Sequence, residues 1–243
     1  MGTRIAGKQW VAKRQPYKLG GGTPFVPITL VGTSSAQDLG TATVTINVPA
    51  GTQNGDVMIL MMSLDGGTAT KPAAFTAVPV TGLNWNPGAL GFKTLNCWYR
   101  VASSEPASYT ITHTSGHDSS LVMATYRNVN NVTPIDTNNT TFVGASKASP
   151  DTDNITGITT TTANCMIVVG LMPDTSVAHV VTFTTSSGMT VEVTQSTSTN
   201  NAQSALGDVL QPAAGASGTK SWTTTAAGVT LTNFAYTVAL RHA

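Results

Sequence analysis

The sequence has few charged residues. Asp, Glu, Lys and Arg together make up 9% of its 243 residues, about a third of their share in an ordinary soluble domain. Glutamate occurs only at Glu105 and Glu192, and lysine, arginine and glutamine are scarce as well. The residues that favour exposed helices are therefore missing. Few carboxylates remain from which a catalytic pair could be assembled.

Cysteine and long apolar runs are also nearly absent. Cys97 and Cys165 have no CxxC partner and no histidine at ligand spacing, so neither a disulfide framework nor a zinc site is predicted. We expect two buried free thiols, but a single bridge between them stays open because sequence gives no Cα separation. The most apolar stretches, residues 57–64 and 165–172, are far shorter than the roughly 20 residues of a membrane helix. No apolar run of about 7 to 15 residues follows Arg4, so no secretory signal is expected either.

Threonine, by contrast, is abundant. Its 42 copies are about one residue in six, and its β-branched side chain suits a half-buried pleated surface. No segment has a convincing helical period, so the sequence predicts an all-β, two-sheet, jelly-roll-like sandwich of about a dozen strands. The strands are expected near residues 28–31, 42–48, 57–64, 95–102, 108–114, 120–127, 155–161, 165–172, 180–185, 189–195, 204–211, 220–225 and 230–240.

Two hydrophobic patterns separate half-exposed strands from covered ones. In residues 109–113 and 191–194 every second residue is apolar, which predicts one packed face and one threonine-rich solvent face. Residues 57–62 and 166–169 are apolar at every position. We expect these to be central strands covered on both sides, by the other sheet and by a loop or a neighbouring subunit.

The chain divides into an N-terminal arm, residues 1–23, and a β body, residues 24–243. Gly20, Gly21 and Gly22 followed by Pro24 form a hinge where the arm ends. The body contains two similar halves, about 24–130 and 150–243, whose matching segments lie about 110 residues apart. Thus residues 55–62 parallel 163–170, residues 107–112 parallel 219–224, and residues 121–127 resemble 234–241.

Two interpretations of these halves stay open. They are either two small sandwich domains or the two halves of one sandwich. The link over residues 128–153 is polar and contains prolines, as a domain linker would be. We favour a single domain, because an isolated half with five or six strands would leave long edges unprotected.

The arm differs from the body in charge. Its first twenty residues carry five bases and no acid, whereas the remainder carries seven bases and eleven acids. Five charges alone do not distinguish nucleic acid, an acidic membrane or an acidic protein as the partner. We predict anchoring to protein rather than to nucleic acid or membrane, because apolar groups lie among the bases. The predicted partner-binding residues are Arg4, Lys8, Trp10, Lys13, Arg14, Tyr17, Lys18 and Leu19.

No catalytic, cofactor-binding or metal-binding constellation is predicted. Glu105 lies in a turn and Glu192 has no acid at i+2 or i+4, and no GxSxG or phosphate-binding glycine loop occurs. The segment 113–118 could present two imidazoles and a carboxylate, but a polar hairpin turn is favoured. Trp85, in a polar loop, is a candidate glycan contact. We therefore expect a non-enzymatic protein without a cofactor.

A spaced motif in the body resembles a known group of proteins. It consists of Pro-Ala-Gly at 49–51 with Gly-Asp at 55–56, Tyr-Arg-Val-Ala at 99–102 with Glu-Pro at 105–106, Tyr-Thr at 109–110, Tyr-Arg-Asn-Val at 126–129 and Pro-Ile-Asp at 134–136. The pattern, over roughly residues 44–240, is similar to that of jelly-roll sandwich proteins found among tailed-bacteriophage virion proteins and some bacterial surface proteins. It departs at Asn128, where glycine is usual.

The resemblance implies a virion setting more firmly than it implies any binding residue. We expect a non-enzymatic structural protein, a capsid decoration or cement protein that binds the shell through its arm. Its expected partners are the major capsid protein or other virion proteins and further copies of itself, on the capsid surface or the tail. The alternatives are a tail or fibre component, and a carbohydrate-binding module or adhesin using Trp85 or Trp222. A polysaccharide hydrolase is disfavoured by the shortage of glutamate.

Overall fold

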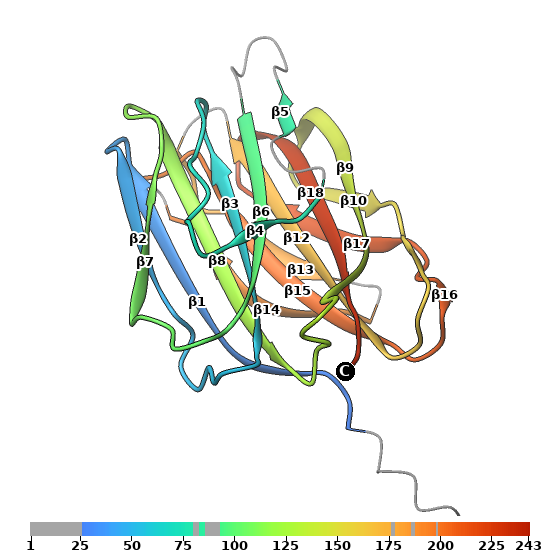
Figure 1. Ribbon diagram of the computed structural model, residues 1–243. Coiled ribbons are helices and arrows are strands. Elements are labelled where there is room, and N and C mark those ends of the chain that lie inside the picture. The colour runs from blue at the N-terminus through green and yellow to red at the C-terminus, as the bar shows by residue number, and fades with distance from the viewer. Residues whose placement is uncertain (1–25, 80–82, 86–92, 176–177, 186–187, 198) are drawn as a thin grey trace, which may run out of the picture.

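The structure is a computed structural model that describes residues 26–79, 83–85, 93–175, 178–185, 188–197 and 199–243 (Figure 1). The described residues form eighteen strands and no helix, so the predicted all-β sandwich is confirmed. Four of the strands, β4, β5, β11 and β16, are only two or three residues long. The other fourteen compare with the dozen expected from the sequence. The predicted arm, residues 1–23, lies outside the described residues.

The first half of the body forms two antiparallel sheets. The larger, sheet I, has the order β1-β8-β3-β6-β4, with β5 also paired to β6, and the smaller consists of β2 and β7. Their bounds are β1 Thr29–Leu39, β2 Thr43–Asn47, β3 Val57–Leu64, β4 Thr76–Ala77, β5 Leu83–Trp85, β6 Lys93–Val101, β7 Ser108–Thr112 and β8 Asp118–Arg127.

The second half repeats this plan. Sheet II has the order β14-β15-β12-β18-β9, a small sheet has the order β10-β17-β13, and β11 pairs with β16. Their bounds are β9 Ile135–Ala148, β10 Asp151–Ile155, β11 Thr159–Thr160, β12 Cys165–Thr175, β13 Thr182–Thr185, β14 Thr190–Gln195, β15 Ser204–Gln211, β16 Gly215–Ala216, β17 Lys220–Thr225 and β18 Thr230–Leu240.

The two large sheets share one strand order. Strand β3 lies between β8 and β6 in sheet I, and β12 lies between β18 and β15 in sheet II. The outermost strands β1 and β9 pair with β8 and β18 respectively. The similar sequence segments include the equivalent strands β3 with β12 and β8 with β18 of the large sheets, and β7 with β17 of the small sheets.

Strand β9 corrects the sequence interpretation of residues 128–153. That segment was expected to be a link, but it contains a 14-residue strand that pairs along its length with β18. Its first half, residues 136–141, is Asp-Thr-Asn-Asn-Thr-Thr and is half-buried. A strand at the edge of a sheet needs little apolar surface, so it lacks the alternation by which strands are recognised.

Four of the five sheets stack as layers, and an apolar core lies between each pair of neighbouring layers. Val57, Ile59 and Met61 of β3 face sheet II, whereas Met58, Leu60 and Met62 face the β2–β7 sheet. Strand β12 divides its side chains in the same way, between sheet I and the β10–β17–β13 sheet. Both central strands are thus covered on both sides, as predicted, but the second cover is a small sheet of the same half and not the expected loop or neighbouring subunit.

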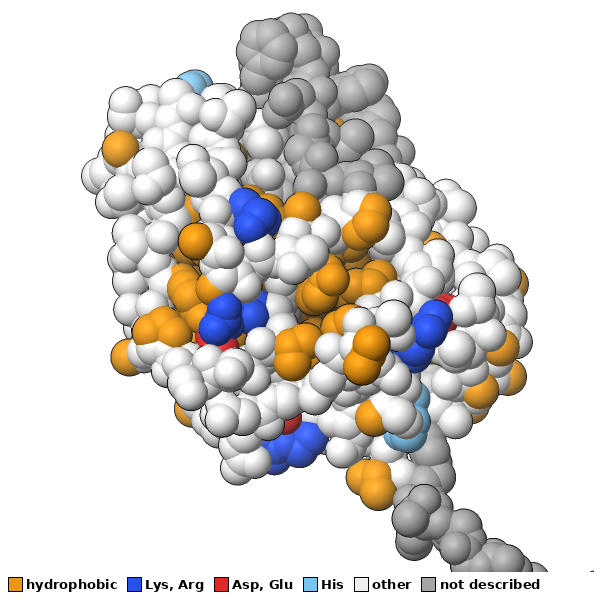
Figure 2. All heavy atoms as spheres, viewed as in Figure 1, with side chains coloured by type: hydrophobic (Ala, Val, Ile, Leu, Met, Phe, Trp, Pro, Cys, Tyr) orange, Lys and Arg blue, Asp and Glu red, His pale blue; other side chains and the backbone are white. Residues whose placement is uncertain are grey.

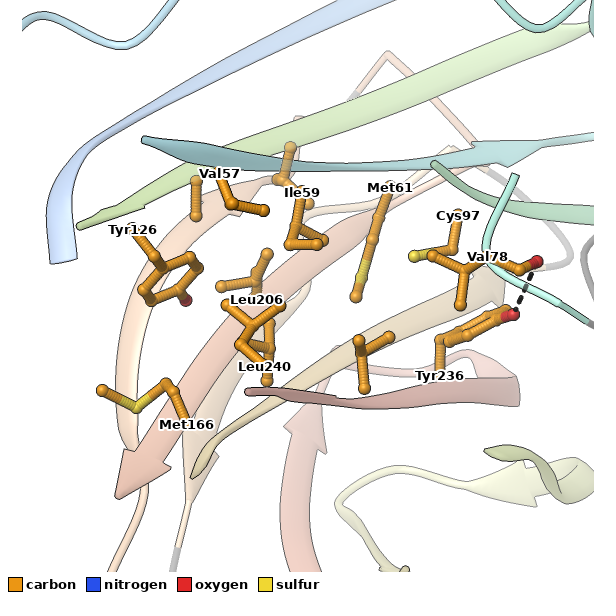
Figure 3. Packing of buried hydrophobic residues seen from close by; sticks show 14 of the residues in the cluster. Val57, Ile59, Met61, Val78, Cys97, Tyr126, Met166, Leu206, Tyr236 and Leu240 are labelled. Carbon is orange, nitrogen blue, oxygen red and sulfur yellow. Dashed lines mark hydrogen bonds between the residues drawn. The ribbon is translucent and has the colours of Figure 1, made fainter. Parts of the chain in front are cut away.

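The core between the two large sheets joins the halves (Figure 3). The residues that face each other there include Val57, Ile59, Met61 and Tyr126 of sheet I and Met166, Leu206, Tyr236 and Leu240 of sheet II. A Cβ atom on Gly170 of β12 would lie 1.9 Å from Met61 Sδ, so the Met61 side chain occupies the space that the glycine leaves between the sheets.

Polar contacts join the two halves at the borders of the apolar layer between them. The Tyr236 hydroxyl donates to the Pro79 carbonyl oxygen at 2.6 Å. At the opposite border, Gln195 Nε2 and the Thr197 hydroxyl donate to Gln37 Oε1 at 3.0 and 2.9 Å. The Ser204 hydroxyl donates to the Ser120 carbonyl oxygen at 3.0 Å. Hydrogen bonds as well as apolar contacts therefore join the two halves.

Candidate functional site: motif residues and a surface groove

The structure leaves the predicted binding residues untested. Arg4, Lys8, Trp10, Lys13, Arg14, Tyr17, Lys18 and Leu19 all lie outside the described residues. Trp85 belongs to β5, where its backbone pairs with Lys93, but its side chain is outside the described part of the chain. The candidate site in the described residues consists of the motif residues and the surface of the body.

The Gly-Asp and Tyr-Arg elements of the motif form one ion pair. Arg127, at the end of β8, donates from Nε and Nη2 to the two carboxylate oxygens of Asp56, at 2.9 and 2.8 Å. Asp56 also accepts the Gln53 backbone N–H at 2.8 Å, and Gly55 before it has a φ of 89°. The almost fully buried carboxylate thus closes the turn into β3 and ties it to β8.

The Tyr-Arg-Val-Ala, Glu-Pro and Tyr-Thr elements meet at Glu105. Arg100 Nε donates to its two carboxylate oxygens at 2.7 and 2.8 Å, the Tyr109 hydroxyl donates to Oε2, and the Ser103 backbone N–H donates at 2.6 Å. Partial burial raises the pKa of Glu105, but the hydrogen bonds from Tyr109, Ser103 and Arg100 outweigh it and lower the pKa. Glu105 is therefore an ionised structural carboxylate that fixes the β6–β7 connection.

The Pro-Ile-Asp element makes the corresponding bond in the second half. Arg241, just after β18, donates from Nη2 to Asp136 Oδ1 at 2.9 Å. Asp136 also accepts the backbone N–H and the hydroxyl of Thr161, both at 2.6 Å, and these bonds lower its pKa against the effect of burial. All the charged side chains of the motif therefore hold turns and strand ends, so their role in the structure is to fix the fold.

Glu192 has an acidic neighbour that the sequence analysis did not foresee. Asp208 of β15 pairs with Thr190 of β14, and a bulge between Val191 and Val193 brings Glu192 near Asp208. Glu192 has no acid at i+2 or i+4 of its own strand, because this neighbour comes from the adjacent strand. The recognisable signal was the single acid in the apolar run of residues 204–210.

Asp208 lies at the border of the layer between the large sheets. It is 8% exposed and next to the fully buried Tyr126. Burial raises its pKa to about 6, the Tyr126 hydroxyl partly opposes that rise, and Glu192 adds to it. Burial also raises the pKa of Tyr126. The Asp208 carboxylate can therefore take up a proton near neutral pH.

The other candidate side chains have structural partners. His113 Nδ1 lies 3.0 Å from the Thr114 carbonyl oxygen, and His117 Nδ1 lies 2.7 Å from the Asp65 carbonyl oxygen. The described residues contain no group of three or more His, Cys, Asp or Glu side chains that could hold a metal ion. Cys97 and Cys165 are both buried and free, as expected.

Trp222 is not on an exposed face, which corrects the glycan-binding alternative for this residue. It is fully buried, with its ring edge-on to Phe183 at 6.3 Å between centroids. In a strand side chains alternate, so the half-buried Ser221 and Thr223 place Trp222 on the inner face. Gly207 leaves room for the ring, because a Cβ there would lie 3.1 Å from it.

An apolar groove opens where the edges of the two large sheets meet, between β4 and β6 on one side and the start of β9 on the other. Its volume is about 410 Å³, and its apolar lining consists of Ala77, Pro79, Tyr99, Val132, Pro134 and Ile135. Figure 2 shows hydrophobic side chains gathered around a hollow in this face. Val132 is 89% exposed, and its neighbours in the sequence are polar. This exposed valine was a signal that the sequence analysis passed over.

The described chain begins at the same end of the molecule as the groove. His242 Nε2 lies 2.6 Å from the carbonyl oxygen of Val26, the first described residue. The preceding Arg241 donates its backbone N–H to the carbonyl oxygen of Pro134, a groove residue, at 2.8 Å. The N-terminal segment therefore joins the body close to the groove.

Comparisons with known proteins do not assign the chain to a family. No protein-family model matches the sequence, and neither curated proteins nor solved structures give a significant match. Within the described ranges, no helix is long and apolar enough to cross a membrane.

Proposed function

We propose that this chain is a non-enzymatic structural subunit of a bacteriophage particle, a capsid decoration or cement protein anchored through its N-terminal arm. The observation that carries the proposal is the junction between arm and body. A segment with five bases and no acid joins, beside an apolar groove, a body that carries seven bases and eleven acids. Aromatic and arginine side chains such as Trp10 and Arg14 are typical interface anchors.

The architecture of the body supports a load-bearing role. Three apolar cores hold the four stacked layers together, and the motif residues Asp56, Glu105 and Asp136 anchor turns and strand ends. Thr43, Thr45, Thr110 and Thr112 are exposed on the β2–β7 sheet, so the outer face carries short hydroxyl side chains. Such side chains lose little rotamer entropy when subunits pack side by side.

The test is binding to phage shells. Full-length protein and a variant lacking residues 1–22 are mixed with capsid shells, sedimented and imaged by electron microscopy. We expect stoichiometric binding to the capsid surface that is lost with the arm. Binding that does not need the arm, or none at all, would contradict the proposal. Density on the tail alone would support the tail component instead.

Two full-length controls separate charge from apolar anchoring. Replacing Trp10 and Tyr17 by alanine removes the aromatic groups, whereas replacing the five bases by glutamine removes the charge. We expect the first variant to lose binding at all salt concentrations. The second should lose mainly the salt-dependent part, because exposed charges are screened by salt.

Glycan recognition is the second candidate, and it now rests on Trp85 alone because Trp222 is buried. A carbohydrate-binding module predicts glycan-array signals that Trp85→Ala abolishes. An unchanged array after that substitution would remove this alternative.

A further inference from the structure

We propose that the groove lined by Val132, Tyr99 and Ile135 binds the N-terminal segment, residues 1–25, of a second copy of this chain. This contact would link copies head to tail. The inference goes beyond the proposed function, because it gives the arm a second partner besides the shell.

The lining of the groove favours an apolar occupant. Six of its residues are apolar, and Val132 leaves 89% of its surface in water. Asp136, the acid in the lining, has both carboxylate oxygens engaged by Thr161 and Arg241. A volume of about 410 Å³ has room for one or two large side chains. Burial of an apolar side chain there would remove exposed hydrophobic surface from water.

The strand that borders the groove can also bind a segment through its backbone. Strand β9 is the outermost strand of sheet II and pairs with β18 on one side. An edge strand leaves one row of backbone N–H and C=O groups unpaired by its sheet, and an extended segment can add to such an edge.

The N-terminal segment has the matching chemistry. Trp10, Val11, Tyr17 and Leu19 are apolar groups in a stretch without enough neighbours of its own to bury them. The segment carries an excess of bases, and the remainder of the chain carries an excess of acids. Electrostatic attraction therefore draws the segment of one copy toward the body of another copy.

The length of the N-terminal segment lets it reach the groove of a second copy. In Figure 1 the described residues before β1 lie at the end of the body where the C terminus lies, and Val26 and Pro27 contact His242 and Asn128 there. Val26 and Pro27 are exposed there. Twenty-five residues can span about 80 Å, whereas a body of this size is about 45 Å across. Because segment and groove are different surfaces, the contact is head to tail and forms rings or open chains.

The first experiment measures association of the full-length chain by sedimentation velocity over a range of concentrations. We expect oligomers that dissociate on dilution. Val132→Asp places a charge in the groove and should raise the dissociation constant at least about tenfold. Val180→Asp is the matched control, because Val180 is also exposed, at 48%, and lies outside the groove. It should associate like the unmodified chain.

Complementation then tests whether segment and groove meet in trans. A full-length chain with Trp10→Ala and Tyr17→Ala keeps its groove, and the Val132→Asp chain keeps its segment. Each alone should be monomeric, and an equimolar mixture should contain dimers. A monomeric mixture, equal association of Val132→Asp and the unmodified chain, or a monomeric unmodified chain at every concentration would each overturn the inference.

Shell binding by the Val132→Asp chain separates this inference from the proposed function. If Val132→Asp and the unmodified chain self-associate equally and both bind shells through the arm, the groove contact fails and the virion role stands. If groove-dependent association occurs but shells are not bound, the virion role fails and the head-to-tail contact stands.

Discussion

Asn128 occupies a backbone conformation that is unusual for a residue with a side chain. Its φ is 64°, in the left-handed region where glycine is favoured and asparagine is the best-tolerated alternative. Its side-chain Nδ2 donates to the Pro27 carbonyl oxygen at 2.8 Å. The asparagine therefore keeps the conformation expected of a glycine and also fixes the chain that leads into β1.

Substitutions at Asn128 should follow from these two roles. Asn128→Ala loses the hydrogen bond and places a Cβ residue in the left-handed region, so we expect the free energy of unfolding to fall by about 1–2 kcal/mol. Asn128→Gly keeps the backbone conformation and should be closer to the unmodified protein. Urea denaturation of both variants measures the difference. An alanine variant as stable as the glycine variant would contradict this account.

Asp208 should make stability depend on pH. Its pKa is raised to about 6 in the folded protein, so the proton is held more tightly than in the unfolded chain. The stability that this proton contributes is complete below about pH 4 and is lost as the pH rises through 6. Asp208→Asn removes this loss. We therefore expect the free energy of unfolding of Asp208→Asn, relative to that of the unmodified protein, to be about 2 kcal/mol higher at pH 7.5 than at pH 4.

Glu105→Gln is the control with the opposite sign. The pKa of Glu105 is lowered, so its contribution is present above the unfolded pKa and is lost as the pH falls. The unmodified protein should be more stable than Glu105→Gln at neutral pH. This difference in stability should disappear in acid. Thermal unfolding at matched pH values measures both series. Parallel pH curves for Asp208→Asn and the unmodified protein would show that Asp208 does not titrate as described.

At the scale of strands, burial decided what the sequence could predict. The expected ranges 57–64, 204–211, 220–225 and 230–240 coincide with β3, β15, β17 and β18. These strands combine apolar or alternating positions with turn residues at their ends. Strands β1 and β9 are at sheet edges and were shortened or missed, because one covered side leaves a weak periodic signal. The candidate site was less predictable, since the groove and the Glu192–Asp208 neighbourhood depend on strand pairing.

Strand β12 gives a test of how closely the large sheets approach. Gly170→Ala would bring a Cβ to 1.9 Å from Met61 Sδ in a fully buried layer. We expect a loss of about 1–3 kcal/mol in the free energy of unfolding. Combining it with Met61→Ala relieves the overlap, so the double variant should lose less than the two single losses added. Additive losses in a denaturation cycle would contradict this contact.

At the scale of the whole molecule, the middle core makes the halves depend on each other. Either half alone would expose one face of a five- or six-stranded sheet, including Val57, Ile59 and Met61 in the first half. We therefore expect a single cooperative unfolding transition. Calorimetry tests this by comparing the calorimetric and van 't Hoff enthalpies, which should agree. Two separable transitions would favour two independent sandwich domains.

The matching strand orders of sheets I and II also have a consequence for dilution. The layer between them resembles a subunit interface, but both of its faces belong to one covalent chain. Covalent connection keeps the local concentration of one face around the other constant, whatever the protein concentration. Contacts between separate copies lack that protection and follow mass action. A dilute sample should thus contain intact four-layer bodies, and only the contacts between bodies should depend on the protein concentration.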